Sequence, residues 1–324
     1  MKAERRVQHS FSKIQLVQGL TLVAIILLFA AWRAGTPDRR EAGWRNALVR
    51  FEPVALDPRG FGELRLAGAW ALTSDDPRFG GISALAIAGG DFVALSDSGV
   101  VVRFPKPRQQ AARAVIGELP GGPGAPGFKV DRDSEALVRD PLGRGWWVAF
   151  ETSNELWLYD KDFLRALQHI RFGKARWPRN RGIEGIAAVG DALLLLPEMG
   201  DSVLAVRGSS VRQGSIAKPA GRISDAAWLP SRELLVVNRR LTLLGFANSI
   251  APLGPSGNAY RYGRRVELGV GPFDNIEAIA PERLPRGDVR LWLMTDDGYQ
   301  RPFRTLLLAL DLPAKPQQGR RRPS

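Results

Sequence analysis

The chain has 324 residues, 44% of them hydrophobic, which is enough to bury the core of one large domain or two small ones. It has no cysteine, so disulfides, thiolate nucleophiles and cysteine-ligated zinc are excluded. The net charge of +13 lies mostly at the ends, with +5 in residues 1–45 and +4 in residues 314–324, which argues against a nucleic-acid partner for the body of the chain.

An apolar stretch near the N-terminus predicts an export signal. Residues 16–32 (LVQGLTLVAIILLFAAW) follow the basic segment 1–15. Arg33 directly after the run makes a poor cleavage site, so we expect one hydrophobic helix that stays as an anchor in the inner membrane. The positive-inside rule then places the rest of the chain on the periplasmic side. A cleaved signal would export the domain to the same compartment.

The residue composition of the chain changes twice after this segment. Residues 33–60 are charged and contain proline and glycine, so they are expected to form a linker. Over residues 61–312, short runs of Val, Ile, Leu, Trp and Phe alternate with Gly, Pro, Asp and Asn clusters, without a convincing helical period. We predict an all-β domain over 61–312 and a basic, disordered tail over 313–324.

Five segments of this domain resemble one another. In each, a polar residue enters an apolar run, and a second polar residue closes the next apolar run 13 to 19 residues later. The first residues of the pairs are 52, 49, 41 and 52 positions apart, which is within the range of propeller blades or other stacked supersecondary units. The pairs are Ser83 with Asp97, Glu135 with Glu151, Glu184 with Glu198, Asp225 with Asn238, and Glu277 with Asp296.

Each segment reads as a hairpin with outer strands, for example Ser83–Ala88 turning into Phe92–Leu95. We therefore predict a β-propeller of five or six blades, preceded by the N-terminal hydrophobic helix. The last strand, Thr305–Leu312, needs a partner, and Glu63–Leu72 would close the final blade. A sixth blade could lie within residues 100–130 or 239–270.

The two polar residues of a pair should converge, because the first strand of a hairpin starts where the second ends. The pairs then form a ring at one mouth of the channel. So many carboxylates need a counter-charge, most simply Ca²⁺, while nearby arginines would suit an anionic ligand. The expected metal ligands are Asp97, Glu135, Glu151, Glu198, Asp225 and Asp296, with Asp133 and Asp297 beside them, and the expected ligand-binding arginines are Arg181, Arg222 and Arg301. The alternative is turn capping, although glutamate, which recurs in these pairs, is a poor turn former.

The motifs SDSG, DSEALV with FETS, GIEGIA with PEMG, and NIEAIA with TDDG resemble, in this order, the phytase-like family described as having esterase-like activity. The resemblance spans about residues 61–312. It implies a secreted or periplasmic propeller related to phosphate-ester hydrolases that use calcium. The fourth segment departs from the pattern at Asp225 and Asn238, and the first at Ser83, so any site is asymmetric. The matching positions are Asp97, Glu135, Glu151, Glu184, Glu198, Glu277 and Asp296.

Two functions fit these residues. In the first, a metal-dependent phosphoester hydrolase, cations at the ring polarise the phosphoryl group, and Glu184, Glu277 and Arg239 are the catalytic candidates. Its substrate would be a phosphorylated or otherwise anionic small molecule. In the second, a non-catalytic periplasmic propeller binds a small ligand or a protein at the same mouth. A Ser-His-Asp esterase is disfavoured, because the only histidines are His9 and His169.

Overall fold

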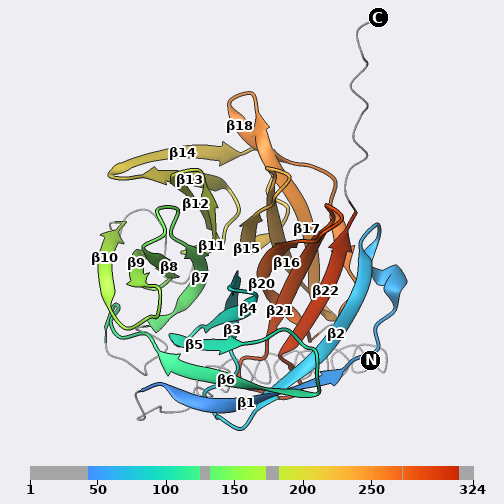
Figure 1. The fold of residues 1–324 in the computed structure, drawn as a ribbon. Helices are drawn as coiled ribbons and strands as arrows, with labels where there is room; N and C mark the ends of the chain where they lie inside the picture. The colour runs from blue at the N-terminus through green and yellow to red at the C-terminus, as the bar shows by residue number, and fades with distance from the viewer. Residues whose placement is uncertain (1–42, 125–131, 173–181, 272, 314–324) are drawn as a thin grey trace, which may run out of the picture.

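The folded chain consists almost wholly of antiparallel strands, which confirms the all-β prediction (Figure 1). The computed structural model describes residues 43–124, 132–172, 182–271 and 273–313. No helix in these ranges has the length and hydropathy to span a membrane. The predicted N-terminal helix at 16–32, its basic flank and the tail beyond residue 313 lie outside the described residues.

The described strands form five units of four strands each. The first strands are β3 (Ile82–Ala88), β7 (Ser134–Arg139), β11 (Ile183–Val189), β15 (Arg222–Trp228) and β20 (Asn275–Arg283). The second strands are β4 (Asp91–Ser96), β8 (Gly145–Phe150), β12 (Ala192–Pro197), β16 (Leu234–Thr242) and β21 (Val289–Asp296). The third strands are β5 (Val100–Phe104), β9 (Glu155–Asp160), β13 (Ser202–Arg207), β17 (Gly245–Ser256) and β22 (Leu306–Leu312). The fourth strands are β6 (Ala111–Glu118), β10 (Ala166–Arg171), β14 (Ser210–Ile216), β18 (Ala259–Tyr262) and β2 (Arg65–Ser74).

These units are the blades of a propeller, numbered 1 to 5 from β3 onward. Each first strand contacts the first strands of both neighbouring blades, so the circle is closed (Figure 1). The described residues thus contain five blades rather than six. The segments considered for a sixth blade supply outer strands instead: β5 and β6 in blade 1, and β17, β18 and the short β19 (Val266–Leu268) in blade 4.

The ends of the domain close the circle as predicted, because β2 pairs with β22 and completes blade 5. The structure also shows a strand, β1 (Arg45–Pro53), inside the segment predicted as a linker. This strand joins β2 to β6 and so ties blade 5 to blade 1. Its alternating residues Ala47, Val49 and Phe51 are buried, which is the two-residue period of a half-buried strand. A 3₁₀ turn, η1 (Pro58–Phe61), separates β1 from β2.

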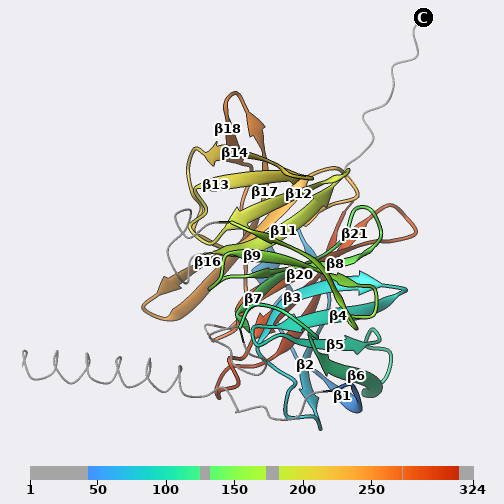
Figure 2. The ribbon, with the colours of Figure 1, turned by 90° about the vertical axis from the view of Figure 1, so that its left-hand side faces the viewer.

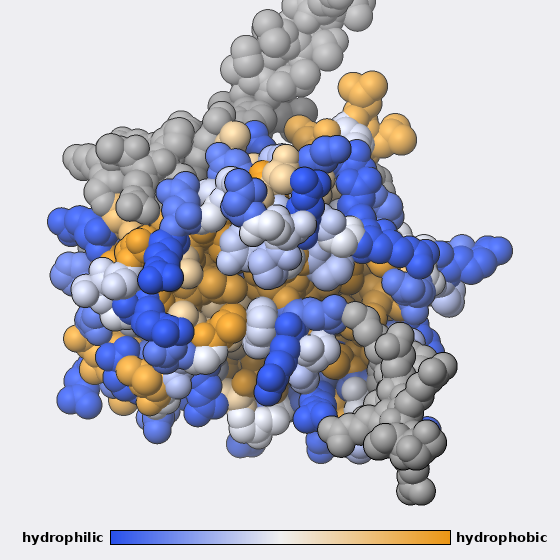
Figure 3. Space-filling view, turned by 90° about the horizontal axis from the view of Figure 1, so that it is seen from above, coloured by the Kyte–Doolittle hydropathy of each residue, from blue (hydrophilic) through white to orange (hydrophobic). Residues whose placement is uncertain are grey.

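The hydrophobic core is divided among the blade interfaces. Five buried clusters each combine side chains from two neighbouring blades. Between blades 5 and 1, for example, the rings of Phe92 and Trp292 meet edge to face with centroids 4.9 Å apart. Seen from above, hydrophilic side chains cover most of the molecule, and hydrophobic surface shows between them (Figure 3). Packing between blades therefore fixes the positions of the inner strands.

All five first strands start at the same end of the propeller, and all five second strands end there. We call this the ring end. The opposite ends of the strands carry short turns, such as the one between Ala88 and Asp91. The predicted convergence of the polar pairs follows from this arrangement. The side view of Figure 2 shows the sheets of neighbouring blades lying one above another.

Candidate metal centre

A bulge occurs near the start of each first strand. The register between first and second strands shifts at Ser83, Glu135, Glu184 and Glu277 in blades 1, 2, 3 and 5. A bulge leaves one residue unpaired and redirects its side chain. The repeated polar residue is therefore the bulged residue in four of the five described blades.

In blade 4, the repeated polar position lies one residue earlier in the structure than the sequence repeat predicted. Its bulge lies at Ser224, because Ile223 pairs with Asn238 and Asp225 pairs with Val237. Ser224 thus takes the position of the glutamates. On the second strand, the position equivalent to Glu151 and Glu198 is Arg239 rather than Asn238, because Asn238 is the partner of Ile223. Blade 4 therefore contributes a hydroxyl and a guanidinium where its neighbours contribute carboxylates.

Asp225, predicted as a metal ligand, faces the junction between blades 4 and 5. Its two carboxylate oxygens accept the backbone N–H groups of Ala226, at 2.7 Å, and Ile279, at 2.8 Å. Burial raises the pKa of Asp225 well above its usual value, against the effect of these two bonds. Asn238 also faces away from the ring, and its side-chain oxygen accepts the hydroxyl of Tyr262 at 3.0 Å. Both residues have structural contacts in place of the predicted site role.

The carboxylates of blades 2 and 3 form the densest acidic group among the described residues. One oxygen from each of Asp133, Glu135 and Glu151 lies within 4.8 Å of the other two, and the same holds for Glu151, Glu184 and Glu198. Glu151 belongs to both triads. Glu151, Glu184 and Glu198 are buried, while Glu135 is half-buried. We call these five residues the acidic cluster.

Burial and the neighbouring carboxylates disfavour ionisation of two members of this cluster, Glu151 and Glu184. Burial, followed by the charges of Asp133 and Glu198, raises the pKa of Glu151 to about 8. Burial also raises the pKa of Glu184 well above its usual value, with Glu151 as the next cause and Arg239 acting in the opposite direction. Without a further counter-charge, the ionised forms of Glu151 and Glu184 are therefore disfavoured.

Several buried oxygen atoms at the ring have no hydrogen-bond partner among the described residues. They include Asp133 Oδ1, Glu198 Oε2 and Glu277 Oε2. A buried carboxylate oxygen without a partner is costly, because it has lost its hydration without replacement. All the available donor atoms here are hard oxygens, which is the ligand set that Ca²⁺ prefers. The residues therefore fit a hard divalent cation.

Two arginines reach the ring from blade 4. The Arg239 guanidinium donates to Glu277 Oε1 and lies 3.4 Å from Glu198 Oε1, with 19% of its side chain exposed. Arg222 donates to Glu198 Oε1 at 2.9 Å but is 60% exposed. Arg301 lies in the exposed loop between β21 and β22, and Arg181 lies outside the described residues. Of the three predicted arginines that the structure describes, Arg222 and Arg239 are thus placed at the carboxylates.

Blades 1 and 5 use their polar residues partly as structural caps. The Ser83 hydroxyl donates to the carbonyl of Ser134 at 2.6 Å and links blade 1 to blade 2. Asp296 Oδ1 accepts the backbone N–H of Gly298 at 2.7 Å, which is a turn cap. Asp97 is buried at the ring end but belongs to neither triad. The turn-capping alternative therefore holds for part of the ring.

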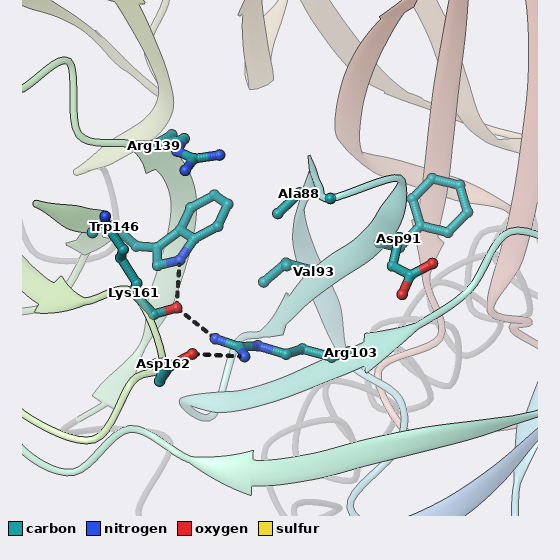
Figure 4. A pocket seen from close by; sticks show the side chains of 11 residues that line it. Ala88, Asp91, Val93, Arg103, Arg139, Trp146, Lys161 and Asp162 are labelled. Carbon is teal, nitrogen blue, oxygen red and sulfur yellow. Dashed lines mark hydrogen bonds and ion pairs between the residues drawn. The ribbon is translucent and has the colours of Figure 1, made fainter. Parts of the chain in front are cut away.

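A separate pocket lies at the opposite ends of the strands, between blades 1 and 2 (Figure 4). Its volume is about 340 Å³, and its lining includes Arg103, Arg139 and Trp146. Arg103 donates to the carbonyl of Lys161 at 2.6 Å and to Asp162 at 3.3 Å. The guanidinium group of Arg103 is thus already hydrogen-bonded to other residues of the protein. The pocket is separate from the acidic cluster.

Comparisons with known proteins agree with the motif resemblance. The sequence model of the family described as phytase-like, with esterase-like activity of phytase, matches residues 77–299. Among curated proteins, none matches the chain significantly. The structure is similar to glutaminyl cyclase of Myxococcus xanthus, with a TM-score of 0.49, 10% identity, and coverage of 76% of this chain and 95% of that one.

A second similar structure is virginiamycin B lyase of Staphylococcus aureus. Its TM-score is 0.45 at 11% identity, over 83% of this chain and 100% of that one. An auxiliary nutrient-binding protein of Bacteroides thetaiotaomicron gives 0.42 at 8% identity, over 83% and 77%. At this level of identity, the activities of these proteins say nothing about the chemistry of the present ring.

Proposed function

Because the chain belongs to the phytase-like family, described as having esterase-like activity, we propose that it is a metal-dependent phosphoester hydrolase that acts at the ring end of the propeller. The observation that carries this proposal is the acidic cluster, whose two triads share Glu151. Buried oxygens without partners in the described residues, on Asp133 and Glu198, support cation binding there.

The acidic cluster would hold the cation, with Ca²⁺ as the first candidate. Bound there, such an ion supplies Lewis-acid polarisation of a phosphoryl oxygen. Arg239 positions Glu198 and Glu277 by bridging them. Arg222 is mostly exposed and so can turn a donor towards an anionic substrate at the mouth. Glu184, Glu277 and Arg239 stay the catalytic candidates, and Asp97 and Asp296 stay candidate outer ligands.

A non-catalytic propeller that binds a small ligand or a protein is the alternative. It is favoured by the state of Arg239, whose guanidinium is already engaged by two carboxylates. His169 lies on an outer strand, stacked on Trp157 at 4.9 Å, so it is remote from the ring.

In both cases we propose that residues 16–32 anchor the domain at the periplasmic side of the inner membrane.

A hydrolysis assay with the full-length protein separates these functions. We expect release of phosphate from phosphomonoesters with Ca²⁺, loss of release with a chelator, and loss of release in Glu184→Gln. Asp191→Asn is a matched control, since Asp191 is an exposed carboxylate at the opposite strand ends that pairs with Arg207. A Ca²⁺-dependent rise in melting temperature without turnover would support the binding module instead. Turnover that survives both the chelator and Glu184→Gln would reject the proposed site.

A further inference from the structure

The connection between the second and third strands is a paired hairpin in blade 4, whereas in blade 5 it is a loop over residues 297–305. In blades 1, 2 and 3 it is a short turn directly after the strand, as in residues 97–99. In blade 4, β16 and β17 continue to pair until Thr242 meets Gly245. The three paired residues beyond Arg239 extend the hairpin by about 10 Å past the ring. Figure 2 shows this hairpin projecting from the left side of the propeller.

The tip of this hairpin is ordered and apolar. The Thr242 hydroxyl donates to the carbonyl of Gly245 at 2.8 Å and accepts the N–H of Leu244 at 3.2 Å. The exposed fractions are 77% for Leu241, 105% for Leu243 and 83% for Leu244. Two-residue turns favour asparagine and glycine, so leucines at this position do nothing for the turn itself. A cluster of exposed leucines on a fixed turn points to an apolar partner.

The surroundings of the tip combine further apolar groups with positive charge. Met199 and Phe273, 39% and 49% exposed, also lie at the ring end. Next to the tip, Arg240 lies 3.6 Å from Glu267, and the same carboxylate accepts Arg265 at 2.9 Å. Two arginines share one carboxylate, which leaves positive charge at the base of the hairpin. Leucines above arginines are the pattern of a segment that enters a lipid surface with anionic headgroups.

The path of the chain gives a second, independent argument. β1 begins at Arg45, which pairs with Ile116 near the end of β6, and that end of β6 pairs with Val100 at the ring end. The chain therefore enters the propeller at the ring end. Residues 33–44 separate β1 from the apolar segment 16–32 and span at most about 40 Å. A membrane that holds this segment would therefore lie within about 40 Å of the start of β1, which is within reach of the ring end and the leucines.

We propose that the tip of the β16–β17 hairpin docks on a phospholipid bilayer and holds the ring end of the propeller against the membrane. Leu241, Leu243 and Leu244 enter the boundary between headgroups and acyl chains, and Arg240 contacts the anionic headgroups. Interfacial segments bury their apolar faces about 5–10 Å deep, which the projection of the hairpin allows. The acidic cluster then faces the lipid surface.

The absence of cysteine allows a direct test, because a single introduced cysteine can be labelled uniquely. The full-length chain carrying Leu243→Cys is labelled with a fluorophore and reconstituted in vesicles of phosphatidylcholine with one quarter phosphatidylglycerol. Leu142→Cys is the matched control, an exposed leucine in the turn between β7 and β8 at the opposite strand ends. We expect spin-labelled lipid to quench the fluorophore at position 243 at least about fivefold more than at 142.

A second variant separates docking from simple attachment by the N-terminal segment. Leu241→Asp and Leu244→Asp, added to Leu243→Cys, should abolish lipid quenching while the chain stays bound to the vesicles. Both changes lie at exposed positions, so an unchanged melting temperature confirms that the fold is intact. Equal quenching at 243 and 142, or unchanged quenching in the aspartate variant, would overturn the proposal. Self-quenching that rises with protein concentration would show that the tip docks on a second copy, which also overturns it.

Discussion

The two sides of the ring use one strand framework for opposite electrostatic arrangements. Blades 2 and 3 bring carboxylates within 4.8 Å of one another, and Glu198 of blade 3 pairs with Arg222 and Arg239, which blade 4 supplies. Blade 4 places Ser224 and Arg239 at the equivalent positions. The bulge fixes where a side chain points, while the residue type decides whether the position needs a cation or supplies one. The comparison therefore favours blades 2 and 3, off-centre in the ring, as the place of the proposed cation.

Removing the guanidinium group of Arg239, which lies mostly buried in blade 4, should have the largest effect on stability. In Arg239→Met, Glu198 and Glu277 lose a shared and mostly buried partner. Breaking such a pair leaves buried charge uncompensated, so we expect a loss of about 3–4 kcal/mol in the free energy of unfolding. Urea denaturation measures this loss. A change in the free energy of unfolding below about 0.5 kcal/mol would mean that Arg239 does not compensate the charges of Glu198 and Glu277.

The acidic side should respond to pH in the metal-free protein. The pKa of Glu151 is raised to about 8, so the stability that its protonated form provides is complete below its usual pKa and is lost as the pH rises towards 8. We expect a loss on the order of 3 kcal/mol between pH 5 and pH 8 in chelator. Thermal unfolding across this range measures the loss. Glu151→Gln should flatten the profile, and an equally steep profile in that variant would assign the effect elsewhere.

The corrected position of Asp225 predicts a structural defect without a metal defect. In Asp225→Asn, an amide group replaces one of the oxygens that accept the N–H groups of Ala226 and Ile279. We expect a loss of about 2 kcal/mol, because one buried N–H is left without a partner. Calcium affinity, measured by calorimetry, should stay within about twofold of the original. A loss of calcium binding without a loss of stability would contradict this account and indicate that Asp225 is a metal ligand, as the sequence predicted.

The smallest effect is expected at Arg222, the exposed arginine of the same blade. Its side chain is 60% exposed, so its pair with Glu198 is weakened by solvent. In Arg222→Met we expect a loss below about 1 kcal/mol by urea denaturation. The difference from Arg239→Met isolates the contribution of burial. Equal losses in the two variants would contradict the distinction between them.

Much of the fold could be predicted from the sequence. The hairpins follow from short apolar runs separated by glycine-rich turns, and the pairing of β2 with β22 follows from the need to cover an open strand edge. The strand β1 was missed, because its charged residues and the nearby prolines hid the alternation of Ala47, Val49 and Phe51. The alternation of these apolar residues with a period of two was the feature of the sequence that could have predicted β1.

The site was predicted less well, because a bulge displaces the register by one residue. In blade 4 the alignment was placed on the acidic residue Asp225. In four of the five described blades an isoleucine precedes the bulge, and in blade 4 this isoleucine, Ile223, marks the true position. Asp133 was placed only beside the ring, whereas its carboxylate belongs to a triad. Distances between carboxylates from different blades depend on how the blades pack, and periodicity along the chain does not contain them.

Calcium titration by calorimetry tests the central claim most directly. The full-length protein in detergent is compared with Glu151→Gln, which removes the carboxylate common to both triads, and with Asp296→Asn at a position outside them. We predict binding by the original chain, a loss of at least about tenfold in affinity for Glu151→Gln, and a smaller loss for Asp296→Asn. Absence of calcium binding by the original chain, or equal affinity in Glu151→Gln, would contradict a cation site at blades 2 and 3.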